Sequence, residues 1–222
     1  MKLRPFLALG LPLLATARAV HAGASLYVDD AGTTPPGHCQ LESWTRSYAP
    51  GQEWSAVPAC TRGGVEYSLG VSSYDRPHDL LLTPGIKRTL RDPDGQAWGA
   101  AISLVAAWDV TQRRLEGWNL TVPVTLAVDA QGRTLLHADL GWSKLRGAAG
   151  ALAGGLALEH RLSGQWSVLA ELYADGSGEM DRQLGLRRAL DATASLDLLA
   201  GCASGRRPGR WFTLGLNMAL PD

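Results

Sequence analysis

The chain has 222 residues, with 21 Lys and Arg, 21 Asp and Glu, and 5 His. This length fits one domain, including a single β-barrel. A nucleic-acid partner would show as an excess of basic residues, and the balanced charge argues against one.

The first 22 residues have the three-part pattern of a cleaved signal peptide. Lys2 and Arg4 form a short positive segment, residues 6–15 form an apolar core, and Val20-His21-Ala22 offers a cleavage site. The core is shorter than the roughly 20 residues that a helix needs to span a bilayer, which argues against an uncleaved anchor. Residues 1–22 are therefore predicted to direct export and to be removed.

Residues 23–37 follow as an extended lead-in, and residues 38–222 read as strands. Apolar residues alternate with small or polar ones at a period of two, as in strands with two different faces. Turn sequences such as Asp92-Pro93-Asp94-Gly95 separate the runs. We predict an all-β fold, an antiparallel transmembrane β-barrel of about 12 strands, an even number as in bacterial single-chain barrels. The strands are expected near 38–48, 52–61, 64–74, 80–90, 97–108, 117–128, 136–142, 149–161, 166–172, 180–189, 193–203 and 211–220.

The composition of the second face favours a barrel in the bacterial outer membrane over a soluble one. Gly, Ala, Ser, Thr and Asn stand between the apolar residues, where a soluble barrel would carry Lys and Glu. Tryptophans at strand ends add to this, because Trp favours the bilayer interface. A soluble periplasmic lipid-binding barrel, with its faces inverted, is an alternative. The tryptophans expected at the interfaces are Trp98, Trp108, Trp118, Trp142 and Trp166.

Loop lengths predict the orientation of this barrel. An even number of strands puts both termini on one side, taken as the periplasm, where turns such as Ser163-Gly164 read as short. Most loops on the other side read as longer, as at residues 109–117, which is the asymmetry of outer-membrane barrels. Cations in the longer loops either bind phosphates of lipopolysaccharide or are simply solvated. They are Arg113, Arg114, Lys144, Arg146, Arg206, Arg207 and Arg210.

Charged residues on the inward face of the later strands are the candidate lumen site. Such charges need partners where water is scarce, and a ladder of Glu171, Arg187 and Asp197 is predicted across neighbouring strands. The ladder is either a structural plug or a polar constriction that selects a solute. The full set of lumen candidates is Glu159, Arg161, Glu171, Arg187, Asp197, His137 and Asp139.

No catalytic residue, metal site or cofactor is predicted. Ser143 and His137 share a face but lie about 20 Å apart along an extended strand, too far for proton transfer. The spacing of His and Cys matches no metal-binding pattern. Cys39 and Cys60 flank the first predicted hairpin at nearly opposite positions, so a disulfide between them is within reach. Cys202 reads as an inert, small apolar residue.

The segment Tyr27 to Gly37 (YVDDAGTTPPG) and the last four strands resemble outer-membrane transporters of the meta-pathway phenol-degradation type. The resemblance implies a barrel that moves small apolar or aromatic compounds. The chain departs from barrel proteins in ending with Leu220-Pro221-Asp222, because the barrel-insertion machinery usually reads a terminal aromatic residue. The strand segments concerned are WSVLAELY (166–173), RQLGLRRAL (182–190), ASLDLLAG (194–201) and WFTLGLNMAL (211–220).

Together these features predict a monomeric outer-membrane barrel that acts as a passive channel or transporter for small molecules, and not as an enzyme. The alternative is a barrel with a filled lumen. It would have a structural role, or would bind lipopolysaccharide or a protein partner through its basic loops.

Overall fold

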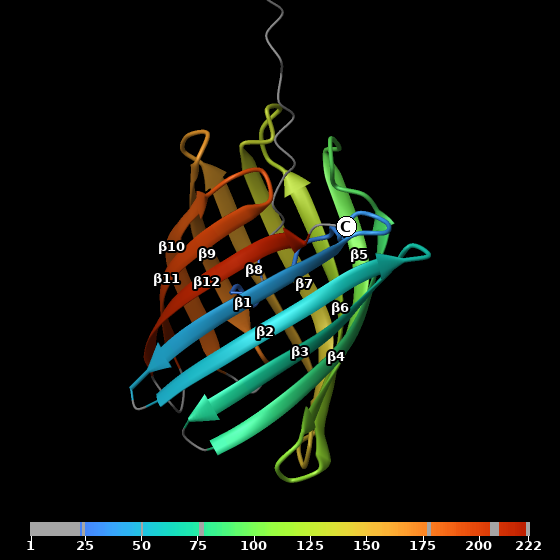
Figure 1. Ribbon diagram of the computed structural model, residues 1–222, viewed down its shortest axis with the longest axis vertical. Helices are drawn as coiled ribbons and strands as arrows, with labels where there is room; N and C mark the ends of the chain where they lie inside the picture. The colour runs from blue at the N-terminus through green and yellow to red at the C-terminus, as the bar shows by residue number, and fades with distance from the viewer. Residues whose placement is uncertain are drawn as a thin grey trace, which may run out of the picture.

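The described part of the chain folds as a closed antiparallel barrel of twelve strands (Figure 1). The computed structural model describes residues 23, 25–49, 51–75, 78–176, 179–204 and 209–220, and the predicted signal peptide (1–22) lies outside them. Within these residues no helix is long and apolar enough to cross a membrane. The strands are β1 (Cys39–Tyr48), β2 (Gly51–Arg62), β3 (Val65–Asp75), β4 (His78–Arg91), β5 (Trp98–Asp109), β6 (Arg114–Ala127), β7 (Thr134–Leu145), β8 (Ala151–Arg161), β9 (Trp166–Ala174), β10 (Met180–Ala189), β11 (Ala194–Ser204) and β12 (Arg210–Leu220).

Each strand pairs with its neighbours in sequence, and β1 closes the barrel by pairing with β12. This last register runs from Cys39 opposite Leu220 to Tyr48 opposite Trp211. We call the end of the barrel that carries Cys39 and Leu220 the terminal end, and the opposite end the loop end. The predicted fold class is confirmed, and closure gives the two edge strands the partners that a membrane requires.

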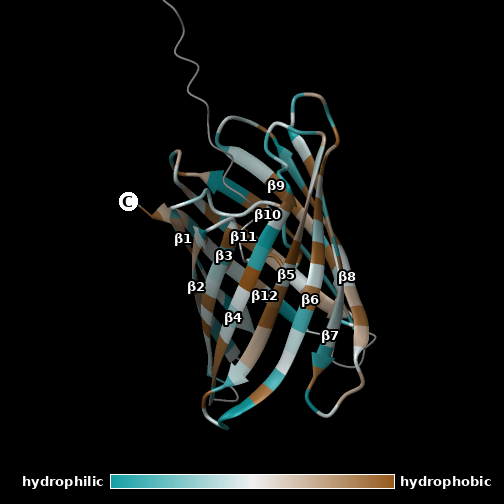
Figure 2. Cartoon of the chain, turned by 90° about the vertical axis from the view of Figure 1, so that its right-hand side faces the viewer, coloured by the Kyte–Doolittle hydropathy of each residue, from teal (hydrophilic) through white to brown (hydrophobic). Residues whose placement is uncertain are grey.

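The outer face of the wall is apolar and the inner face is polar. Phe212 is 67% exposed and Leu184 61% exposed, whereas Glu171 and Gln183 are buried on the inner side. Figure 2 shows the apolar residues alternating with polar ones along the strands. In water such an outer surface would drive association, but in a bilayer it contacts acyl chains. A soluble barrel with an apolar interior does not match this arrangement.

The five tryptophans expected at the membrane interfaces project from the outer wall near strand ends. Their exposed fractions range from 37% to 45%. Trp54 of β2 is a sixth outward tryptophan. The sequence did not indicate it because residues 52–61 alternate weakly. Trp98 and Trp166 lie at the terminal end, and Trp108, Trp118 and Trp142 lie toward the loop end.

The predicted difference in loop length between the two ends is wrong. β3 continues to Asp75, β4 starts at His78, and only four residues separate Asp109 of β5 from Arg114 of β6. Connections span two to six residues at the terminal end and two to five at the loop end. Strand pairing continues past the point where the sequence turns polar, because the backbone ladder does not need apolar side chains. The periplasmic location of the terminal end therefore stays a prediction.

The first hairpin contains the predicted disulfide. Cys39 and Cys60 face one another across β1 and β2, and their sulfurs are bonded. Cys202 of β11 is a free cysteine with intermediate exposure.

Candidate functional site

Residues 25–34 lie inside the barrel, and the exposed residues Pro35 and Pro36 connect them toward β1; we call residues 25–36 the inner belt. The sequence predicted only an extended lead-in over residues 23–37. The inner belt does lack strand pairing, but it runs along the inner wall instead of leading up to the barrel. Val28, Ala31 and Thr34 are buried there. The inner belt therefore fills part of the lumen.

Side chains of the wall accept hydrogen bonds from the inner belt. An extended segment without a neighbouring strand leaves its N–H groups unpaired, and each costs about 1–3 kcal/mol if it is buried that way. Most of the acceptors are carboxylates, which make the stronger charge-assisted bonds. The pairs are Ser25 Oγ to Asp197 (2.7 Å), Val28 N to Glu171 (2.5 Å), Asp29 N to Asp139 (2.9 Å), Ala31 N to Thr125 (2.9 Å) and Thr34 N to Glu66 (2.7 Å).

The lumen is packed with side chains along β8 to β11. Leu26 of the inner belt forms an apolar cluster with Leu169 of β9 and Leu199 of β11. Nearer the terminal end, the Arg187 guanidinium donates two hydrogen bonds to Asp197, of 2.7 and 2.8 Å, and one of 3.0 Å to Glu159. One guanidinium is thereby shared by two carboxylates in a largely buried network, and the Asp197 carboxylate also accepts a hydrogen bond from Ser25.

The predicted ladder of Glu171, Arg187 and Asp197 is wrong in one member. Arg187 faces Asp197 across β10 and β11, but across β10 and β9 it faces Ser167. Glu171 instead faces Gln183, whose amide donates to it. Glu159 on β8 is the second carboxylate that binds Arg187, because the long Arg187 side chain reaches past the small Ser167.

An aromatic cluster lies toward the loop end of the lumen. The Tyr27 ring stacks on Tyr173 with centroids 5.5 Å apart, and its centroid lies 6.3 Å from that of Trp211 in an edge contact. The Arg46 guanidinium lies 4.6 Å from the centroid of Tyr27, within the range of a cation–π contact. Glu53 lies 3.7 Å from the same guanidinium. The lumen thus carries an aromatic surface beside a charged pair.

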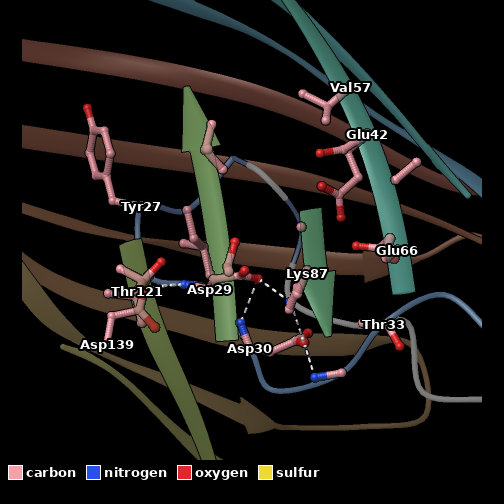
Figure 3. A pocket seen from close by; sticks show the side chains of 18 of the residues that line it. Tyr27, Asp29, Asp30, Thr33, Glu42, Val57, Glu66, Lys87, Thr121 and Asp139 are labelled. Atoms are coloured by element: carbon pink, nitrogen blue, oxygen red, sulfur yellow. Dashed lines mark hydrogen bonds and ion pairs between the residues drawn. The ribbon is translucent and has the colours of Figure 1, made fainter. Parts of the chain in front are cut away.

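A cavity of about 280 Å³ lies between the inner belt and the β1 to β7 side of the wall (Figure 3). Lys87 Nζ lies 2.8 Å from the Asp29 carboxylate and 3.6 Å from that of Asp30. Enclosure in the barrel raises the pKa of the Asp29 carboxyl, and the Lys87 ammonium opposes this shift. Among the described lining residues, the acids are Asp29, Asp30, Glu42, Glu66 and Asp139 and the base is Lys87.

Two acceptor atoms on the cavity lining, Asn119 Oδ1 and Asp139 Oδ1, have no hydrogen-bond partner among the described residues. Nearby, His137 Nδ1 shares a 2.9 Å hydrogen bond with Thr125, and its Nε2 is likewise unpartnered within that part of the chain. Buried polar atoms are normally paired, so these atoms mark positions where water or a solute can bind.

Several lining residues were not among the predicted site residues. Glu42, Glu66 and Lys87 occupy inward positions of early strands, which alternation could have indicated. Asp29 and Asp30 belong to no strand, so no pattern placed them in the lumen. Arg161, which was predicted there, is exposed at the end of β8. No cluster of three or more His, Cys, Asp or Glu in the described ranges could hold a metal ion.

The described cations of the predicted outer loops lie at the loop end. Two of them have partners within the chain, since Arg114 pairs with Glu116 and Lys144 donates to the carbonyl of Ala148. The others are Arg113, Arg146 and Arg210, which are exposed, and Arg206 and Arg207, which lie outside the described residues.

A closed barrel with an apolar wall and a polar lumen defines the class of the protein, the β-barrels of the bacterial outer membrane. The family model described as "Uncharacterised conserved protein UCP029691" matches residues 10–220, so the chain belongs to that family. No curated protein matches the sequence.

Solved structures share the fold at low sequence identity. The KdgM porin has a TM-score of 0.67 at 8% identity, covering 82% of this chain and 99% of its own. The NanC porin has a TM-score of 0.61 at 8% identity, with coverages of 82% and 100%. The COG4313 outer membrane channel from Pseudomonas putida F1 has a TM-score of 0.52 at 9% identity, with coverages of 86% and 98%.

Proposed function

We propose that the protein is a passive outer-membrane channel for small molecules, narrowed by its inner belt, that favours cationic and neutral solutes over anionic ones. The observation that carries this is the charge of the cavity, where five carboxylates face one lysine among the described lining residues. Rings of carboxylates give cation preference in channels. The channel folds of the similar structures support the passive mechanism.

The unpartnered acceptors support the same choice of solute. Asn119 Oδ1 and Asp139 Oδ1 can accept hydrogen bonds, so a solute with N–H or O–H donors, such as a small amine, matches them. One KdgM porin structure was solved in complex with disordered oligogalacturonate, which is an acidic sugar chain. The acidic cavity here argues against a solute of that charge.

An aromatic solute is a second candidate, favoured by the rings of Tyr27, Tyr173 and Trp211 at the loop-end side of the lumen. It agrees with the resemblance to transporters of the phenol-degradation type. Uptake of phenol by proteoliposomes that contain Tyr27→Ala, compared with the native protein, tests this candidate directly.

Insertion by the barrel-insertion machinery and a monomeric state complete the proposal. A closed barrel of this kind keeps its fold in SDS until it is boiled. We therefore expect a single monomer band whose mobility shifts on boiling, in the outer-membrane fraction.

The test is the reversal potential of the native protein in a planar bilayer under a KCl gradient. We expect K⁺ to be preferred over Cl⁻, with a weaker preference in Glu42→Gln and a stronger one in Lys87→Gln. Glu116→Gln is the matched control, because Glu116 pairs with Arg114 at the loop end, outside the cavity. Preference for Cl⁻ would overturn the selectivity. Absence of current, both in the native protein and in a variant without residues 25–36, would favour the filled-lumen alternative.

A further inference from the structure

A groove crosses the outer wall from β7 to β12, on the face that contacts the membrane. Its volume is about 720 Å³. Its lining residues include Glu171 and Gln183, whose buried side chains point into the lumen, so the charged side chains on its outward face are those of Arg182 and Arg210. The floor is set by small outward residues, Ala170 of β9 and Ala200 of β11. Larger outward side chains of the neighbouring strands, such as Leu184 and Phe212, stand beside them.

The strand registers show that the groove follows one row of paired residues. Adjacent strands are about 4.8 Å apart, so the five steps of this row cover about 24 Å measured across the strands. Because barrel strands tilt by about 35–45° from the barrel axis, the row descends by about 15 Å along that axis, more than half the height of the roughly 25 Å apolar band. Phe212 lies near the loop end of its strand and Leu136 near the terminal end of its own. The groove therefore descends through the hydrocarbon region. The row is Leu136, Leu158, Ala170, Leu184, Ala200 and Phe212.

Two arginines mark the loop end of this groove. Arg182 of β10 and Arg210 of β12 both face Cys202 of β11 in register, which puts their backbones about 10 Å apart. Both side chains are exposed, and neither makes a hydrogen bond or ion pair to another described residue. The other outward positions of β9 to β12 carry no acid within the described ranges. Two guanidiniums at a membrane face, without a partner in the described part of the chain, match an anionic group, above all phosphate, which they bind by paired N–H donors.

We propose that this groove is a binding site for a phosphorylated glycolipid of the outer leaflet, of the lipopolysaccharide type. Arg182 and Arg210 hold a phosphate of the headgroup, and an acyl chain lies in the apolar row below them. The proposal uses the predicted orientation, in which the loop end faces outward. It does not depend on conduction, because the groove lies outside the wall.

The test is native mass spectrometry of the refolded mature chain in a zwitterionic detergent, titrated with lipid A that carries two phosphates. We expect Arg182→Gln/Arg210→Gln to weaken binding by about tenfold or more, since both hydrogen bonds to a charged group are lost. Arg188→Gln is the matched control, because Arg188 is outward on β10 but at the terminal end, over the Trp166 ring. It should leave binding within about twofold of the native protein, the scale of a surface change.

Two further changes, one in the lipid and one in the groove, separate the contribution of the phosphate headgroup to binding from that of the acyl chain. Dephosphorylated lipid A should bind the native protein and the double variant equally weakly. Ala200→Phe, which fills the groove and keeps both arginines, should also weaken binding. Each variant is first checked for its boiling-dependent gel shift, so that loss of the fold is not read as loss of the site. Equal binding of lipid A by the native protein and the double variant would overturn the proposal, as would equal binding of phosphatidylglycerol.

Cys202 supplies a second readout without any added probe site. It is the free cysteine, since the sequence has three and the other two are bonded. Lipid A held between Arg182 and Arg210 should slow alkylation of Cys202 by a water-soluble maleimide in the native protein and not in the double variant. Equal rates with and without lipid A in the native protein would contradict the placement of the phosphate.

Discussion

Replacement of Asp197 by Ala tests the buried charge network of the lumen. Asp197 is fully buried, and it accepts hydrogen bonds from Arg187, Ser25 and Asn217. Its removal leaves the Arg187 guanidinium in an ion pair with Glu159, at 3.0 Å. Removing one partner of a buried ion pair costs about 3–5 kcal/mol, because the remaining charge stays away from water. We expect Asp197→Ala to lower the free energy of unfolding by that amount.

Glu159→Gln is the matched control for this prediction. The Glu159 side chain is 16% exposed, and its loss leaves both bonds between Arg187 and Asp197 in place. A loss of about 1–2 kcal/mol is therefore expected, near the net value of one charged hydrogen bond. Both variants are compared with the native protein by urea unfolding in phosphatidylcholine vesicles, followed by tryptophan fluorescence.

A double-mutant cycle then asks which acid is the partner of Arg187. Combining Arg187→Gln with Asp197→Ala should give a coupling energy of at least about 2 kcal/mol, within the range for residues in one network. Combining it with Glu171→Gln should give less than about 0.5 kcal/mol, the level expected of independent sites. A destabilisation by Asp197→Ala no larger than that of Glu159→Gln would refute the reasoning. So would equal coupling of Arg187 to both acids.

Three other perturbations address the inner belt, the cavity and the first hairpin. Deletion of residues 25–36 should raise single-channel conductance several-fold, because the lumen loses its largest occupant; unchanged conductance would contradict this. Lowering the pH from neutral should weaken the preference for K⁺, and this loss should begin at a pH above the usual pKa range of a carboxyl group. The reason is that the raised pKa of Asp29 lets its carboxylate gain a proton at a higher pH than usual. A selectivity that does not change with pH would argue against this. Cys60→Ser should destabilise the barrel by about 2–4 kcal/mol in urea unfolding, since the disulfide closes a separation of 21 residues. Equal urea-unfolding midpoints for Cys60→Ser and the native protein would show that strand pairing keeps this hairpin folded without the disulfide.

The wall of the barrel could be predicted from the sequence because the alternation of apolar and polar residues within each strand shows which side chains face outward and which face the lumen. Alternation in residues 117–128 and 211–220 placed Val122 and Phe212 outward before any tertiary information. The same alternation placed Asp197 and Arg187 in the lumen. It could not say which inward groups meet, because that depends on the stagger between strands. A shift of four residues separates the pairing of Glu171 with Gln183 from that of Arg187 with Ser167.

The inner belt could not be predicted because its contacts are not periodic. Residues 25–36 bond to strands far apart in the sequence, from Glu66 of β3 to Asp197 of β11. No local pattern encodes such contacts, and a segment rich in Gly, Thr and Pro reads as a linker. The inward carboxylates were a partial signal. In the structure Glu171 and Asp139 face no cation on a neighbouring strand, and N–H groups of the inner belt donate to both carboxylates.

The inner face of β8 shows how the wall is shaped for the inner belt, and where a solute can pass. Ala153, Gly155 and Ala157 occupy alternate inward positions of this strand. A Cβ on Gly155 would lie 2.6 Å from a Val28 methyl and 2.5 Å from the Leu172 carbonyl oxygen, so neither the inner belt nor β9 leaves space for one. The room that small residues create on this side is thus taken by the chain itself. Space for a solute remains on the side of β1 to β7, so Glu42 and Lys87, and not the Arg187 network, should set the selectivity.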